Sequence, residues 1–251
     1  MSSSVDDPGR EEAEELARIR AEYERRRREV PREHWKVRLF VRQMRERLLL
    51  AELSRAGALP LRERRILDVG CGSGQWLADF QTWGASRRRL AGIELDPQAV
   101  LHARARLAPS GAGPAAGEAD IHEGAAGEMP WPDGSFDVVL QATMLSSILD
   151  QDMRRQVAAE MMRVLAPGGV ILSYDMRIEN PRNPQVRALP RQELEALFAG
   201  MRVRARRVTL ALPVSRRLVP VSWFAAEVLE RVSLLNTQLL AVIERPDAHT
   251  P

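Results

Sequence analysis

The chain has 251 residues, 45% of them hydrophobic, which allows one large buried core and leaves too little for a second independent domain. Its net charge of +3 rests on arginine, because Lys36 is the only lysine. The only cysteine, Cys71, excludes an internal disulfide and a cysteine-rich metal site, and no run of about 18 apolar residues offers a membrane span.

Two charged helices are predicted ahead of the first strand. The first covers residues 10–29, where Glu14 and Arg18 are spaced for pairing one turn apart. The second covers residues 33–56 and stops at Gly57. The charged start holds no apolar stretch long enough for a signal peptide, so we expect a cytoplasmic protein without membrane insertion.

Residues 65–74 read as a buried strand that ends in an acid, Asp68, and runs into a glycine-rich turn that opens a helix. A side chain at any of the three glycines would hold a ligand away from the backbone amides or require an unfavourable φ. These glycines are Gly70, Gly72 and Gly74. Cys71, between them, reads as a small residue chosen for fit, since nothing near it in sequence activates a thiol.

The spacing of this turn distinguishes between cofactors. A dinucleotide fingerprint needs a glycine where the chain has Gln75, whereas Asp-x-Gly-x-Gly-x-Gly fits without a gap. Asp68 suits the ammonium group of a bound amino acid and would repel a pyrophosphate. The turn therefore predicts S-adenosylmethionine as the cofactor.

A second carboxylate completes the nucleoside signal. The apolar run of residues 90–94 ends in Glu94, about 20 residues past the turn, where a ribose-binding acid is expected. We expect Glu94 to hold both ribose hydroxyls, with Leu95 beside it as a further cofactor contact.

Four segments in a fixed order carry a wider pattern. They are Asp68–Gly74, Gly92–Asp96, Met129–Val139 and Glu160–Gly169. Together they resemble the class I S-adenosylmethionine-dependent methyltransferases, in the branch with quinone-biosynthesis and other small-molecule enzymes. A closer similarity, to bacterial methyltransferases from glycan and natural-product gene clusters, rests on Ser147–Asp150, Tyr174-Asp175 and Asn180–Pro184. The resemblance implies the reaction type and leaves the substrate open.

The rest of the chain alternates strands and helices, which predicts an α/β fold with a Rossmann-like, doubly wound sheet and helices on both faces. Strands are expected near residues 65–69, 90–94, 119–122, 136–141 and 169–174, followed by 203–210 and 239–244. Helices are expected near residues 74–82, 97–107, 151–165 and 191–198. The resemblance implies seven strands with an antiparallel end.

Residues 1–60 are expected to form a disordered tip and a helical lid, and residues 61–246 the methyltransferase core. Within the core, the apolar residues 213–237 are either packing for a covering helix or the roof of the acceptor pocket. Residues 247–251 are expected to be a disordered tail. The lid would exclude water from the reacting groups, and its Tyr23 and Trp35 would contact the substrate.

Further site residues follow from the carboxyl ends of the strands, where ligands bind in this topology. Ala126 falls where related enzymes place the adenine-binding segment, and Gln141 is expected to face the methyl donor. Thr143 and Tyr174 are predicted to contact the substrate.

A hydroxyl acceptor that is not already acidic needs a base, for which His34 and Asp175 are the candidates. Each also has an ordinary reading, as a packed histidine and as an aspartate that caps a turn. The other histidines show no metal-ligand spacing, so no metal is expected.

The sequence thus predicts methyl transfer to a small molecule by a monomer or homodimer, with oxygen favoured over nitrogen or carbon. Two alternatives remain, an RNA methyltransferase and a protein that binds the cofactor without catalysis. The arginine runs lack the interleaved aromatic residues that stack bases, so nucleic acid is not the expected partner.

Overall fold

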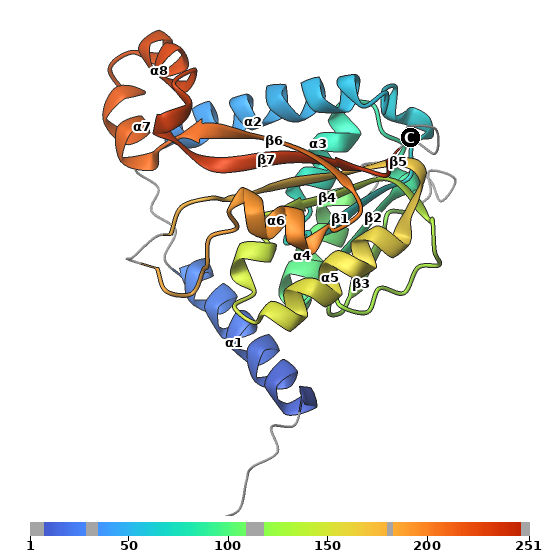
Figure 1. Ribbon diagram of the computed structural model, residues 1–251. Helices are drawn as coiled ribbons and strands as arrows, with labels where there is room; N and C mark the ends of the chain where they lie inside the picture. Colours follow the sequence, from blue (N-terminus) through green and yellow to red (C-terminus); the bar gives the residue numbers. More distant parts are fainter. Residues whose placement is uncertain (1–7, 29–34, 109–117, 180–182, 247–251) are drawn as a thin grey trace, which may run out of the picture.

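The computed structural model describes residues 8–28, 35–108, 118–179 and 183–246, which fold around one seven-stranded sheet (Figure 1). The strand order is β3-β2-β1-β4-β5-β7-β6. The strands are β1 (Ile66–Val69), β2 (Leu90–Glu94), β3 (Asp120–Glu123), β4 (Phe136–Ala142), β5 (Leu165–Met176), β6 (Arg202–Leu210) and β7 (Asn236–Glu244). β1 to β5 are parallel, and β7 runs antiparallel between β5 and β6. This confirms the predicted α/β class with its doubly wound sheet and antiparallel end.

The central strand β1 is buried along its whole length, as its apolar sequence requires. Its end pairs on one side with β2, Val69 lying opposite Ile93, and on the other side with β4, Val69 lying opposite Gln141. The chain therefore leaves β1 in one direction across the sheet and β4 in the other. Such a reversal opens a crevice at the carboxyl ends of the strands, where ligands bind in this architecture.

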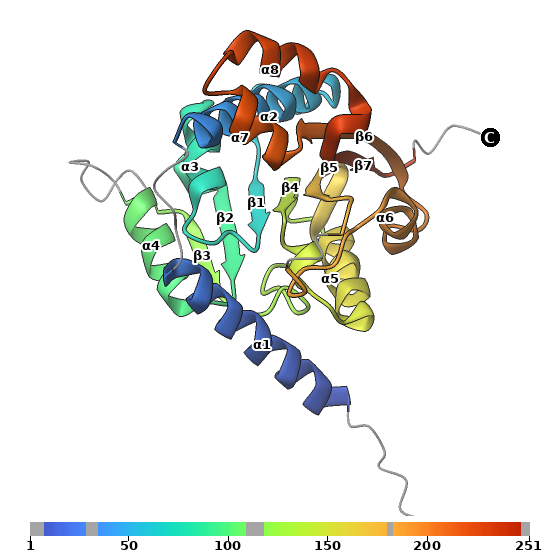
Figure 2. The same cartoon turned by 90° about the vertical axis from the view of Figure 1, so that its left-hand side faces the viewer.

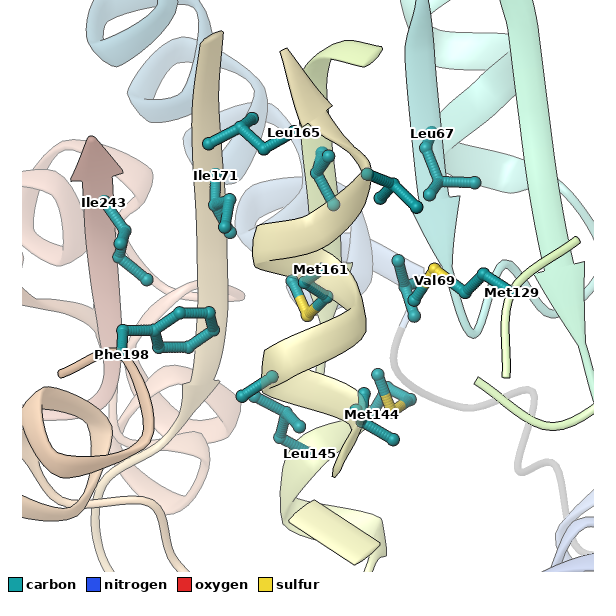
Figure 3. Close-up of a cluster of buried hydrophobic side chains, with 14 of the residues drawn as sticks. Leu67, Val69, Met129, Met144, Leu145, Met161, Leu165, Ile171, Phe198 and Ile243 are labelled. Atoms are coloured by element: carbon teal, nitrogen blue, oxygen red, sulfur yellow. The ribbon is translucent and has the colours of Figure 1, made fainter. Parts of the chain in front are cut away.

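Helices cover both faces of the sheet. Leu53 of α2 (Trp35–Arg55), Phe80 of α3 (Gln75–Thr82) and Val100 of α4 (Pro97–Leu107) are buried in a core with Ile66 of β1. The opposite core contains α5 (Gln151–Val164) and α6 (Arg191–Leu197), and Figure 3 shows Met161 of α5 at its centre.

α1 (Pro8–Arg28) lies at the carboxyl ends of the parallel strands (Figure 2). Its Ile19 is 7% exposed and belongs to the same core as Met161. α2 lies elsewhere. It packs on α3 through an ion pair of 2.6 Å between Arg42 and Asp79, and on α8 (Trp223–Glu230) through the rings of Phe40 and Trp223. Only the first of the two N-terminal helices therefore reaches the crevice in the described part of the chain.

The apolar stretch between β6 and β7 forms two helices, α7 (Leu212–Leu218) and α8, followed by the 3-10 turn η6 (Ser233–Leu235). The break falls at Pro220-Val221, and Ser222 starts α8 by accepting a hydrogen bond of 3.1 Å from the amide of Ala225. β5 begins at Leu165, earlier than the sequence suggests, because Leu165 pairs with Phe136 of β4.

A buried cation joins α5 to α6. The Arg154 side chain is fully buried, pairs with Glu193 at 2.6 Å, and donates hydrogen bonds to the carbonyl oxygens of Ile148 and Arg187.

Arg154→Met is expected to lower the free energy of unfolding by roughly 3 kcal/mol, because it leaves these acceptors in the interior without a hydrogen-bond donor. Urea denaturation measures the loss. Arg155→Met, on the exposed side of the same helix, should cost under about 0.5 kcal/mol, and equal losses would contradict this assignment.

Candidate cofactor site

The turn after β1 brings backbone close to its neighbours. Gly70 has a φ of 72°, and a Cβ placed there would lie 2.5 Å from Cγ of Met144, so no larger residue fits. Gly72 has a φ of 52°, and a Cβ there would meet nothing within 4 Å. The turn therefore leaves open space beside Gly72 while Gly70 lies against the loop after β4.

Glu94 fastens this turn to the end of β2. One of its carboxylate oxygens accepts a hydrogen bond of 2.8 Å from the amide of Gly72, and the other accepts one of 3.0 Å from the amide of Asp96. The side chain is 4% exposed, and burial raises its pKa despite these amides. A carboxylate held this way has further lone pairs for hydroxyl donors of a ligand.

Asp68 is the most unusual group of the site. It is 1% exposed, and neither carboxylate oxygen has a hydrogen-bond partner in the described residues. Burial, and then the nearby charge of Glu94, raise the pKa of Asp68 to about 8. A buried carboxylate without partners is costly unless a ligand supplies a donor or a positive charge. The ammonium group of an amino-acid ligand would supply both.

Cys71 fills the space between the turn and β2. It is 5% exposed, its Sγ lies where a Cβ on Gly92 would approach to 2.8 Å, and burial raises the pKa of its thiol. These contacts agree with a residue selected for size.

A narrow cavity opens next to the turn, between the ends of β1 and β2 and the loops after β3 and β4. Water-sized molecules can occupy about 50 Å³ of it. Predicted cofactor contacts that line the cavity are Gly70, Glu94, Leu95 and Ala126. Apolar residues that line it without having been predicted are Leu16, Ile19, Met144 and Ile148.

α1 covers this cavity and is fastened to its rim. The carboxylate of Glu15 accepts a hydrogen bond of 2.6 Å from the amide of Leu149, and Arg18 donates one of 2.6 Å to the carbonyl of Ser147. Arg18 also donates to the side-chain oxygen of Gln185 at 2.8 Å. Ile19 is the most deeply buried apolar residue among the described side chains of this charged helix, and it marks the side of α1 that faces the protein.

Gln141 shapes the loop after β4. It is fully buried, its side-chain oxygen accepts hydrogen bonds from the amides of Met144 and Leu145, and its nitrogen donates to the Ser173 hydroxyl at 2.6 Å. Thr143 is exposed at the head of this loop with a φ of 59°, a conformation that costs energy in a non-glycine residue. Gln141 thus supports the loop from behind, while Thr143 faces solvent.

Asp175 and Tyr174 are not among the residues that line the cavity. Asp175 is 1% exposed and accepts hydrogen bonds from the amides of Ser146 and Met176, while burial raises its pKa. Tyr174 shares a hydrogen bond of 2.7 Å with the hydroxyl of Thr209. Their predicted roles, base and substrate contact, stay predictions, and the observed contacts are structural.

The guanidinium of Arg45 lies over the rings of Trp76 and Tyr174, 5.1 and 5.6 Å from their centroids. Its Nε is buried without a hydrogen-bond partner in the part of the chain that is described. No sequence pattern predicts this group, which α2 places against α3 and β5.

Three other predicted residues belong to the N-terminal region. Trp35, at the start of α2, is 59% exposed and is not among the residues that line the cavity. Tyr23 belongs to α1, but its side chain lies outside the described part, as does the whole of His34. Their proposed roles therefore stay predictions.

The methyltransferase domain family has a sequence model that matches residues 66–169, from β1 into β5. Residues 66–169 therefore match a methyltransferase domain. A probable S-adenosylmethionine-dependent methyltransferase of Mycolicibacterium smegmatis is 37% identical over 150 residues, covering 56% of this chain and 52% of that protein. The 27-O-demethylrifamycin SV methyltransferase of Amycolatopsis mediterranei is 36% identical over 121 residues, covering 45% and 39%.

The chain thus spans about half the length of the first of these relatives, and less of the second. Among solved structures, the [4+2]-cyclase SpnF is similar with a TM-score of 0.58 at 21% identity, covering 80% of this chain and 81% of that one. At this identity the likeness shows the fold alone. S-adenosylmethionine is the cofactor of this family. The glycine turn and Glu94 fit its nucleoside end, and Asp68 fits its amino-acid end.

The raised pKa of Asp68 has a measurable effect on stability. Between its ordinary pKa of 3.8 and about 8, the folded protein holds a proton that the unfolded chain has released, so stability falls as pH rises. Asp68→Asn should reduce this fall by at least about 1 kcal/mol between about pH 5 and about pH 8, measured by urea denaturation without cofactor. Asp152→Asn, at an exposed site, should leave it unchanged. A fall in Asp68→Asn as steep as in the wild type would contradict a protonated Asp68.

Proposed function

We propose that the protein transfers the methyl group of S-adenosylmethionine to a small-molecule acceptor, with an acidic hydroxyl or enol oxygen as the preferred site. The observation that carries the proposal is the pair of buried acids at the reversal point of the sheet, of which Glu94 lines an apolar cavity and Asp68 lies on the neighbouring strand. The acceptor atom named for the rifamycin relative is an oxygen, which supports the choice of atom.

Each end of the cofactor would have its own residues. Glu94 would accept hydrogen bonds from the ribose hydroxyls, and Leu95, Ala126 and Met144 would line the adenine with apolar surface. Asp68 would take the ammonium group, which satisfies its buried oxygens. When bound, the cofactor supplies a methyl group on a positively charged sulfur, and this sulfur is the leaving group when a lone pair of the acceptor approaches the methyl carbon from the opposite side.

The chain's own contribution to the reaction is positioning and exclusion of water. α1 closes the cavity with Leu16 and Ile19, and the hydrogen bonds of Glu15 and Arg18 keep it there. Holding two reactants in line lowers the activation free energy of a displacement by several kcal/mol. An acceptor hydroxyl that is already acidic needs no base, so phenols and enols are the acceptors that ask least of these residues.

The structure bears on the alternative of RNA as acceptor. Of the alternating arginines on β6, Arg204 pairs with Glu244 at 3.2 Å and Arg206 with Glu52 at 2.8 Å. A phosphate would have to compete with these acids for the two arginines, so this strand gives RNA little specific support. The second alternative, cofactor binding without methyl transfer, is kept open by the fold shared with a cyclase.

The direct test is a turnover screen. The full chain is incubated with S-adenosylmethionine and panels of phenols, enols, sugars and amines, and release of adenosylhomocysteine is followed. The proposal expects methylated product from the phenol or enol panel. Product from amines alone would contradict the preferred atom, and binding of cofactor without product in any panel would support the non-catalytic alternative.

Glu94→Gln should weaken adenosylhomocysteine binding roughly 10- to 100-fold, because a charged acceptor for the ribose hydroxyls is lost. Isothermal titration calorimetry measures the change. Glu63→Gln, an exposed acid in the 3-10 turn η2 (Leu61–Glu63), is the matched control and should bind like the wild type. Equal affinities of Glu94→Gln and wild type would refute the ribose assignment.

Ile19→Ala should raise the dissociation rate of adenosylhomocysteine roughly fivefold, since it removes apolar cover from the cavity. Stopped-flow fluorescence with a chasing ligand measures this rate. Arg20→Ala changes the next residue of α1, which is exposed, and should leave the rate as it is. If both variants release the ligand at the wild-type rate, α1 is not a cover.

A further inference from the structure

The segment between β6 and β7 exposes an unusual amount of apolar surface. Six of the eleven strongly exposed large hydrophobic residues in the described chain fall within residues 212–234. They are Leu212, Val221, Phe224, Val228, Val232 and Leu234. Val221 is 83% exposed, Phe224 75% and Leu234 74%. We call these six residues the apolar face of α7 and α8, which stand out from the sheet at one corner of the molecule (Figure 1).

α8 is apolar on both sides. Its inner side packs against α2, where Ala226 is fully buried and Trp223 touches Phe40 with ring centroids 5.2 Å apart. Phe224 and Val228 lie one turn apart on the side that is exposed. An ordinary surface helix carries polar residues on its outer side, so the outer side of α8 is built for contact with something apolar.

In this segment the acidic side chains contact the rest of the protein, whereas the basic side chains face solvent. Glu227 pairs with Arg47 of α2 at 3.1 Å, and Glu230 accepts a hydrogen bond from the amide of Thr209, so both acids turn toward the protein. Three arginines, Arg216, Arg217 and Arg231, are exposed, and no acidic residue of this fully described segment is. The surface around the apolar face is therefore positively charged.

We propose that the apolar face of α7 and α8 docks on an anionic membrane surface. Exposed aromatic and aliphatic side chains enter the boundary between headgroups and acyl chains, and arginines around them bind lipid phosphates. The docking is peripheral, since no helix in the described ranges has the length and apolarity to cross a bilayer.

The charge pattern also distinguishes a membrane from a second copy of the chain. In a symmetric dimer the same face meets itself, which would bring the three exposed arginines of each copy together without acids to balance them. An anionic lipid surface balances them instead.

The position of the segment fits this role. β6 ends at Leu210, which pairs with Asn236 of β7 next to the end of β5, where Met176 pairs with Gln238. α7 and α8 therefore leave the sheet at the edge where the parallel strands end, the edge that also holds the glycine turn.

Sedimentation of the full chain with lipid vesicles tests the proposal. Vesicles of equal parts phosphatidylglycerol and phosphatidylcholine should pull down the protein, and phosphatidylcholine vesicles should bind it much less. Phe224→Ser should lower the partition constant on the order of tenfold, and Arg216→Gln with Arg217→Gln on the order of fivefold per arginine. Each variant should keep the wild-type thermal midpoint, since these side chains are exposed.

Matched controls are Leu101→Ser on α4, 56% exposed, and Arg88→Gln in the 3-10 turn η3 (Arg87–Arg89), and neither should change binding. The proposal is overturned if anionic vesicles bind the protein no better than neutral ones, or if the controls lose as much as Phe224→Ser. It is also overturned if light scattering shows a dimer that Phe224→Ser separates, because a second copy then covers this face.

Discussion

The candidate cofactor site depends on two buried carboxylates, Asp68 and Glu94, near the carboxyl ends of the neighbouring strands β1 and β2. Glu94 is held by the amides of Gly72 and Asp96, so it connects the glycine turn to β2 and sets how far apart they stand. Asp68, on the neighbouring strand, has no such support, and the charge of Glu94 adds to the cost of ionising it. The fold therefore stores unfavourable electrostatics where a positively charged ligand would relieve them, which is how binding sites commonly differ from the rest of a protein.

The surrounding structure keeps these groups dry and in register. Helices on both faces of the sheet bury β1 and β2. The side-chain oxygen of Gln141 holds the loop after β4 by accepting hydrogen bonds from the amides of Met144 and Leu145. α1 closes the remaining side. α7 and α8 follow the end of β6, so the site and the exposed apolar face share one end of the sheet, although Figure 1 shows α1 and α8 on opposite sides of it.

Much of this architecture could be predicted because its signals are local. β2 and α4 fall where the apolar run and Pro97 place them, and the glycine turn needs its residues for conformational reasons that a sequence displays. The placement of α1 and α2 could not be predicted, since charged helices carry little record of their partners. Which side of residues 213–237 faces outward could not be predicted, because an apolar stretch looks alike whether it faces a core or solvent. Only tertiary packing shows that Phe224 faces outward.

A crystal structure of the full chain with adenosylhomocysteine tests the central claim most directly. The ribose hydroxyls should lie on the carboxylate of Glu94, the ammonium group at Asp68, and the adenine among Leu95, Ala126 and Met144 under α1. A ligand bound elsewhere, or a nucleoside in this cavity that leaves Asp68 without a partner, would contradict it.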